Sequence, residues 1–193
     1  MAKFRAMKTP ALILAAAILL VACDRTSIVG PKNVAQPEDP AAAAAPPSIL
    51  SPQGWGPVRI GMRAQAALEA TGGVLPVVKQ EGSDCYYLRP TSSDSVLVMI
   101  QADRVTRIEA IAGTAPVVTD TGLTVGATER QIRERYSAEL EAEPQKYLPA
   151  PAGYLTWWNQ RTQQGVRYVL GADGKTERII VGGPAIRLVE GCS

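Results

Sequence analysis

The chain has 193 residues, with 20 lysine and arginine side chains against 18 aspartate and glutamate side chains and no histidine. The lack of histidine excludes serine–histidine and cysteine–histidine nucleophile pairs and histidine-bearing zinc sites. The balanced charge argues against nucleic-acid binding, which needs a clustered positive face. Carboxylates such as Asp94 with Asp103, or Glu139, Glu141 and Glu143, fit solvated loops and helix faces. We therefore expect no enzymatic activity, no cofactor, no metal ion and no nucleic-acid partner.

The first 22 residues have the layout of a secretory signal. Lys3, Arg5 and Lys8 form a positive start, and residues 11–22 are an uninterrupted apolar run. This run has twelve residues and is too short to span a bilayer, which needs about 20. Because three basic side chains belong to the signal, the rest of the chain has 17 basic against 18 acidic side chains and is nearly neutral.

The residues Leu20-Val21-Ala22-Cys23, at the end of the apolar run, resemble a bacterial lipobox. The resemblance implies that Cys23 receives a diacylglyceryl group, that the signal is cleaved before Cys23, and that the new terminus is acylated, as with palmitate. The alternative is a plain secretory signal with a coincidental cysteine. Several acyl chains on one residue give stable membrane binding, whereas a single chain binds reversibly. We predict a lipid-anchored protein of the cell membrane or the outer membrane that faces the periplasm.

Residues 23–52 have the composition of a tether. Prolines recur through this segment, and residues 41–45 are all alanine. Such sequence contains too few large apolar side chains to repay the entropy lost on ordering. We predict a semi-extended spacer, at about 3 Å per residue, between Cys23 and a folded head at 53–193.

Two further cysteines, Cys85 and Cys192, remain once Cys23 is lipidated, and the predicted compartment is oxidising. We predict that they form a disulfide. It would close a loop of about a hundred residues and contribute on the order of 4 kcal/mol to stability. The alternative, two buried free thiols, fits Cys192 poorly because a residue next to the chain end is hard to bury.

The head contains an internal repeat. Residues 58–68 align with residues 123–133 at an offset of 65, and each unit has an apolar residue, a glycine and then a run of helix-forming residues. Thr128 followed by Gln131 is typical of a capping box at the start of a helix. We predict one helix of two to three turns in each unit.

Segments rich in aromatic and β-branched residues follow each predicted helix, which favours strands. Residues 171–174, with the sequence Gly-Ala-Asp-Gly, favour a tight hairpin turn between two of them. We predict an α+β fold in which two tandem helix-plus-antiparallel-sheet units, about 53–119 and 120–193, pack into one body. The predicted strands are residues 85–88, 96–100, 105–111, 154–159, 166–170 and 177–181.

The openings Ile60-Gly61-Met62 and Val125-Gly126-Ala127, with the helix-then-hairpin order, resemble a known superfamily. It includes the β-lactamase inhibitory protein and the small lipoprotein of the outer-membrane barrel assembly machinery (SmpA/OmlA type). The resemblance covers most of residues 58–181 and implies a non-enzymatic module that binds other proteins through an antiparallel sheet. We therefore predict a protein-binding module of the cell envelope. The alternative is a lipoprotein inhibitor of a periplasmic or exogenous hydrolase.

Aromatic side chains on the predicted strands are candidates for contact with an envelope protein. Residues 154, 156 and 158 share one face of their strand, while Leu155 and Trp157 share the other. Leu155 indicates that Trp157 faces the core. The alternative is that loops and the chain end cover both sheet faces, which would make the aromatic residues structural. The predicted partner-binding residues are Tyr154, Trp158 and Arg161, with Tyr86 and Tyr87 at the matching place in the first unit.

Overall fold

A computed structural model of the chain describes residues 48–72, 74–79, 83–136 and 139–192. All of these residues belong to one compact unit, Ala44–Ser193. The predicted signal, the lipid-bearing Cys23 and most of the predicted tether lie outside the described residues. In the described ranges, no helix combines the length and the apolar character needed to cross a membrane.

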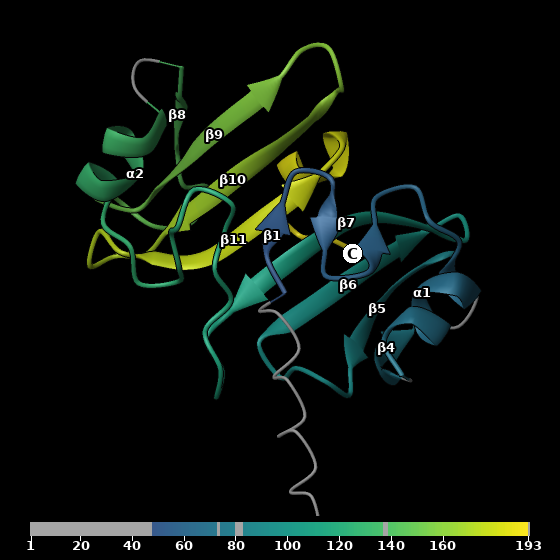
Figure 1. The fold of residues 1–193 in the computed structure, drawn as a ribbon. Helices are drawn as coiled ribbons and strands as arrows, with labels where there is room; N and C mark the ends of the chain where they lie inside the picture. The colour runs from purple at the N-terminus through teal and green to yellow at the C-terminus, as the bar shows by residue number, and fades with distance from the viewer. Residues whose placement is uncertain (1–47, 73, 80–82, 137–138, 193) are drawn as a thin grey trace, which may run out of the picture. The chain divides into compact units, whose positions relative to one another are not determined.

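The main element is a continuous antiparallel sheet of eight strands in the order β4-β5-β6-β7-β11-β10-β9-β8 (Figure 1). Each half of the unit contributes four neighbouring strands. The two halves meet where β7 pairs with β11, with Ile108 opposite Val181. The strands are β4 (Val74–Lys79), β5 (Cys85–Pro90), β6 (Val96–Gln101), β7 (Arg104–Ile111), β8 (Glu141–Pro144), β9 (Gly153–Asn159), β10 (Gln164–Leu170) and β11 (Thr176–Gly182).

The predicted α+β architecture of two packed helix-plus-sheet units is wrong. The described chain is mostly β, because its two α-helices have only seven and eight residues. The strands of both halves also form one sheet instead of two sheets that pack together. The physical reason is the pairing of β7 with β11, which joins the halves by backbone hydrogen bonds and lets both contribute to one apolar core.

One face of the large sheet carries α1 (Ala64–Ala70), α2 (Glu129–Tyr136) and a second, three-stranded sheet (Figure 1). The predicted capping box is confirmed at the start of α2. Gln131 Oε1 accepts a hydrogen bond of 2.8 Å from the Thr128 backbone N–H, and the Thr128 hydroxyl accepts one of 3.4 Å from the Gln131 N–H. The short strands of the second sheet are β1 (Leu50–Ser51), β2 (Gly54–Trp55) and β3 (Val58–Arg59).

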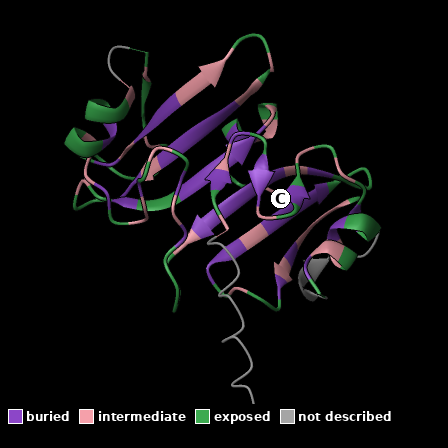
Figure 2. Ribbon diagram, viewed as in Figure 1, coloured by how far each residue is buried: buried purple, intermediate pink, exposed green. Residues whose placement is uncertain are grey.

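The apolar core lies between the large sheet and these covering elements. Side chains such as Ile108, Ile179 and Tyr168 on the sheet are fully enclosed, as is Leu50 of β1. Figure 2 shows the buried residues concentrated along the central strands, with the outer faces of both helices exposed. Leu50 and Ser51, at the end of the predicted tether, therefore belong to the folded unit.

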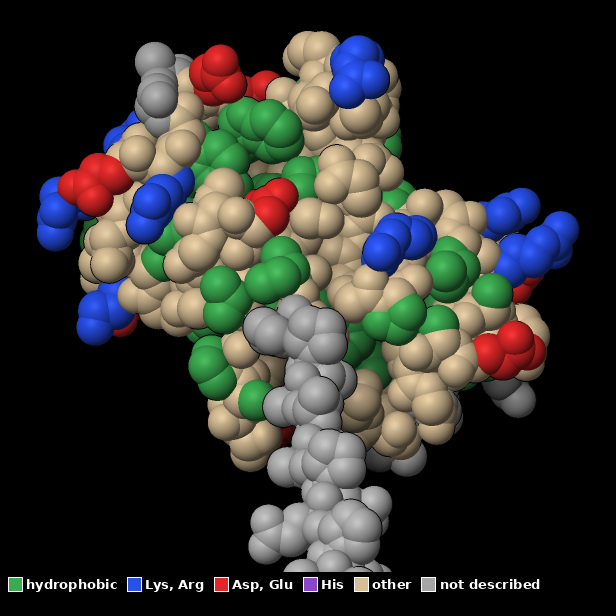
Figure 3. Space-filling view, in the orientation of Figure 1, with side chains coloured by type: hydrophobic (Ala, Val, Ile, Leu, Met, Phe, Trp, Pro, Cys, Tyr) green, Lys and Arg blue, Asp and Glu red, His purple; other side chains and the backbone are tan. Residues whose placement is uncertain are grey.

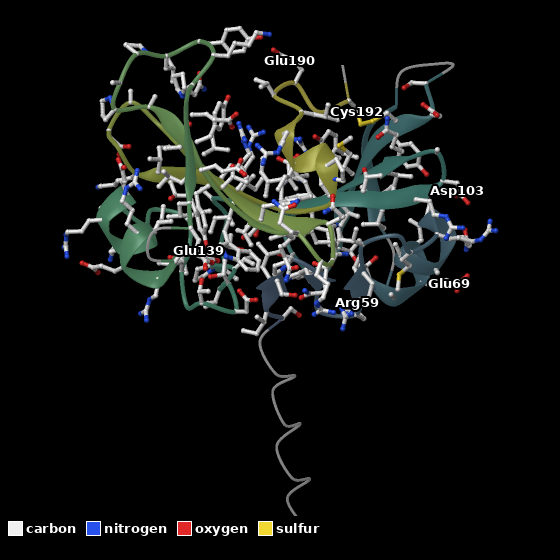
Figure 4. All side chains as sticks on the ribbon, turned by 90° about the horizontal axis from the view of Figure 1, so that it is seen from above. Arg59, Glu69, Asp103, Glu139, Glu190 and Cys192 are labelled. Carbon is white, nitrogen blue, oxygen red and sulfur yellow. A yellow bond between two sulfur atoms is a disulfide. The ribbon has the colours of Figure 1, made fainter. Side chains whose placement is uncertain are left out.

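The opposite face of the sheet is partly covered by residues 184–192, which we call the C-terminal segment. It begins with the 3-10 helix η1 (Pro184–Arg187), which packs on β7, β10 and β11. Cys192 forms a disulfide with Cys85 at the start of β5, which confirms the predicted pairing. Figure 4 shows Glu190 and Cys192 on one side of the sheet and Arg59 and Glu139 on the other.

Candidate functional site

A cluster of ionisable side chains is buried on the sheet face under the C-terminal segment. Arg107 and Glu109 are two residues apart on β7, so they point to the same face. They form an ion pair, and each side chain is 1% exposed. Glu109 also accepts a hydrogen bond of 2.8 Å from the Tyr87 hydroxyl and lies 3.2 Å from Arg178 Nη1. We call Arg107, Glu109 and Tyr87 the buried cluster, and Arg178, whose side chain is 45% exposed, lies outside it.

The buried cluster holds the C-terminal segment in place. Removing a charge from water costs several kcal/mol, so each buried polar atom needs a partner. Arg107 Nη1 donates to the Leu188 carbonyl at 2.7 Å and to the Ala185 carbonyl at 3.2 Å. Burial, followed by the Glu109 charge, raises the pKa of Tyr87 to about 12, so its hydroxyl keeps its proton at neutral pH. The segment therefore supplies acceptors that the buried arginine requires.

A second polar group lies on the same face, nearer to β8. The Arg167 side chain is 5% exposed, and its Nη1 lies 2.6 Å from Glu143 Oε2 and 3.1 Å from the Thr156 hydroxyl. Its guanidinium also stacks on the Tyr154 ring, with 4.0 Å between Cζ and the ring centroid. Tyr154, a predicted partner-binding residue, is thus buried beneath a paired arginine.

Arg167 and Arg178 both line a cavity of about 310 Å³ that the C-terminal segment borders. We call it the C-terminal cavity. Three exposed hydrophobic side chains also line it, namely Tyr147, Leu188 and Val189. With Leu148, the neighbour of Tyr147, they make up four of the five large hydrophobic side chains that the described residues expose. The fifth, Ile49, is not among the lining residues.

The predicted partner-binding residues do not form one patch. Tyr154 lines the C-terminal cavity, whereas Tyr87 belongs to the buried cluster. Trp158 is half-buried, with the Arg187 guanidinium carbon 5.8 Å from its ring centroid. Arg161 is exposed in the turn between β9 and β10, and Tyr86 packs against the core on the helix side.

Sequence reasoning missed Tyr147, Leu188 and Val189. They lie in irregular segments, where neither the helical nor the strand period applies. The available signal was a pair of apolar residues, 188–189, shortly before Cys192, where a disulfide holds the chain end on the domain.

Three of the carboxylates named in the sequence analysis, Asp94, Glu141 and Glu143, have partners within the domain. Asp94 accepts hydrogen bonds from the Thr114 backbone N–H and hydroxyl, which lower the pKa of Asp94. Glu141 and Glu143 pair with Arg187 and Arg167. Across the part of the chain that the structure describes, no three Cys, Asp or Glu side chains are grouped to hold a metal ion.

Comparison of the chain with models of protein families, with curated proteins and with solved structures found no match.

Proposed function

We propose that this chain is a lipid-anchored protein of the bacterial envelope whose folded unit binds another envelope protein in the periplasm. The observation that carries the proposal is the C-terminal cavity with its exposed apolar rim, formed by Tyr147, Leu188 and Val189. Exposed apolar side chains that gather in one place are typical of interaction sites on soluble domains. When a partner buries these side chains, the binding free energy gains about 25 cal/mol for each Å² of apolar surface removed from water.

The charges of the C-terminal cavity favour a partner segment of mainly apolar character. Arg167 and Arg178 line it together with Glu177 and Glu190, so the formal charges cancel. Both arginines are already paired within the domain, and Glu190 lies 3.7 Å from Lys146 Nζ. A strongly charged ligand would therefore have to compete with existing ion pairs. An apolar segment would instead bury the exposed side chains of the rim without breaking an ion pair.

Two observations support the proposed location, a membrane anchor with the folded unit in the periplasm. The lipobox-like sequence ending at Cys23 implies an anchor, and the disulfide between Cys85 and Cys192 is of the kind that persists in oxidising compartments. The predicted tether between Cys23 and Leu50 would give the folded unit reach from the membrane surface.

The binding site is tested by affinity capture of the full-length chain from detergent-solubilised envelope. Leu188→Asp is compared with Ile49→Asp, because these side chains are 42% and 41% exposed but only Leu188 lines the C-terminal cavity. We expect Leu188→Asp to reduce recovery of one defined envelope protein at least about tenfold, and Ile49→Asp to leave it unchanged. Equal effects of both substitutions, or recovery of a soluble hydrolase that the chain inhibits, would contradict the proposal.

The anchor is tested separately with Cys23→Ser. We expect this substitution to move the chain from the membrane fraction to the soluble periplasmic fraction and to remove the acyl mass from its N-terminal peptide. An unchanged membrane fraction would contradict lipid anchoring.

A further inference from the structure

A second cavity, of about 360 Å³, lies at the carboxyl end of α2. We call it the α2 cavity. Its lining combines residues from the start of the folded unit, the loop before α2, the end of α2 and β9. Glu139, one of the lining residues, lies on the side of the sheet opposite Glu190 and Cys192 (Figure 4). The α2 cavity is therefore separate from the C-terminal cavity and does not depend on the proposed function.

Two aromatic rings, Tyr136 and Trp157, form one wall of the α2 cavity. Their centroids are 5.9 Å apart, with 36° between the ring planes. The Tyr136 hydroxyl lies 3.0 Å from the Tyr168 hydroxyl and 3.4 Å from that of Thr121. Trp157 Nε1 donates a hydrogen bond of 3.2 Å to Glu139 Oε2. Both rings are thus held in place by polar contacts at their edges.

The remaining charged groups give the α2 cavity a net negative charge. Among the described residues that line it, Asp120 and Glu139 are accompanied by one arginine, Arg135. None of the three forms an ion pair with another described residue. Burial raises the pKa of Asp120, as expected for a carboxylate without a cationic partner. The carboxyl end of α2 adds a partial negative charge.

We infer that the α2 cavity binds an organic monocation, an alkylammonium or guanidinium group, against Trp157 and Tyr136 with Asp120 and Glu139 as counter-charges. A cation near an indole face gains about 0.5–2 kcal/mol from the ring electrons. Glu139 uses one oxygen for the indole and keeps acceptor capacity for a further donor. The carboxylates of Asp120 and Glu139 and the guanidinium of Arg135 together leave one negative charge in the cavity. A ligand with one positive charge would neutralise it. Figure 3, in the orientation of Figure 1, shows acidic and basic side chains scattered over the molecule, with hydrophobic side chains between them.

The Trp157 indole is itself a reporter for the test. In a ¹⁵N-labelled full-length chain in detergent, the three tryptophans give three indole N–H signals, and Trp157→Phe identifies the one at the site. The probes are N-acetyl-arginine methylamide and butylammonium, with acetate as the anionic control at equal ionic strength. We expect either cation to shift the Trp157 signal saturably with a millimolar Kd, and acetate to leave it in place. A shift by the arginine compound alone indicates that the cavity prefers a guanidinium group, and a shift by butylammonium alone indicates that it prefers an alkylammonium group.

Asp120→Asn is the decisive variant because it removes a counter-charge without touching the reporter's hydrogen bond. We expect it to weaken cation binding about fivefold or more, whereas Glu134→Gln, an exposed carboxylate on α2, should not change it. The other two indole signals must stay in place in Asp120→Asn, which shows that the domain remains folded. No shift with either cation, an equal shift with acetate, or equal affinity in Asp120→Asn and Glu134→Gln would overturn the inference.

Discussion

The Arg107 guanidinium donates a hydrogen bond of 2.7 Å to the Leu188 carbonyl, 81 residues further along the chain. This contact joins a buried ion pair in the middle of the sheet to a residue on the rim of the C-terminal cavity. The proposed binding surface therefore depends on charged residues that a partner would not contact. Changes in the buried cluster should affect stability and the C-terminal segment together.

Glu109→Gln tests the buried cluster. The substitution leaves the Arg107 guanidinium buried without its counter-charge, so we expect the free energy of unfolding to fall by about 3–5 kcal/mol. Denaturant unfolding measures the change. Glu129→Gln is the control, because Glu129 forms an exposed ion pair with Arg133 that is worth at most about 0.5 kcal/mol. Similar losses in the two variants would show that the cluster does not act as an anchor.

Replacing both Cys85 and Cys192 by serine tests the disulfide. These residues are 107 positions apart, and the chain-entropy relation gives a loss of about 4–5 kcal/mol when such a loop is opened. A reducing agent should lower the unfolding midpoint of the natural chain and leave that of the double variant unchanged. Equal midpoints for the oxidised natural chain and the double variant would refute a stabilising role.

The raised pKa of Tyr87 predicts that the free energy of unfolding falls at alkaline pH. The pKa of Tyr87 is raised to about 12 in the folded domain, against about 10 in an unfolded chain. The folded state thus holds this proton more tightly, so the stability that Tyr87 contributes is complete below about pH 10 and is lost as the pH rises through about 12. Tyr87→Phe should remove this part of the alkaline loss, measured as free energy of unfolding against pH. Tyr147→Phe, at a 60% exposed position, should retain it.

Gly165 of β10 lies opposite Trp158 of β9 and leaves room for the Trp158 ring against the strand. A Cβ at this position would overlap with the Trp157 carbonyl oxygen and lie 2.7 Å from Trp158 Cε3. We expect Gly165→Ala to lower the unfolding free energy by about 1–3 kcal/mol. Gly183→Ala is the matched control, because the nearest atom to its added Cβ is 3.9 Å away and its φ of −81° suits any residue. A Gly165→Ala variant as stable as Gly183→Ala would contradict the packing described for Trp158.

Local sequence patterns predicted local structure well. Thr128 and Gln131 form the expected capping box, and residues 171–174 make the expected turn, in which the Gly174 N–H donates to the Gly171 carbonyl at 3.0 Å. On β9, Leu155 belongs to the core, and the Trp157 ring lies beside that of Tyr136 of α2, with 5.9 Å between the ring centroids, on the face opposite Tyr154. The capping box, the turn and the alternation of β9 depend on residues that are close in sequence.

The sheet as a whole and the candidate site could not be predicted in the same way. The alternation of a strand shows which side chains share a face, but it does not show that Ile108 pairs with Val181. Arg107 and Glu109 alternate with apolar residues, a pattern typical of a solvated strand face. They are buried because the C-terminal segment, about 80 residues later, covers them.

Site-specific photocrosslinking in intact cells tests the proposed binding surface most directly. A photoreactive amino acid is placed at Tyr147, on the rim of the C-terminal cavity, and in a matched chain at Gln65, an exposed residue of α1. We expect a covalent adduct with one envelope protein from position 147 and none with that protein from position 65. Adducts of equal yield from both positions, or no adduct from position 147, would contradict the proposed binding surface.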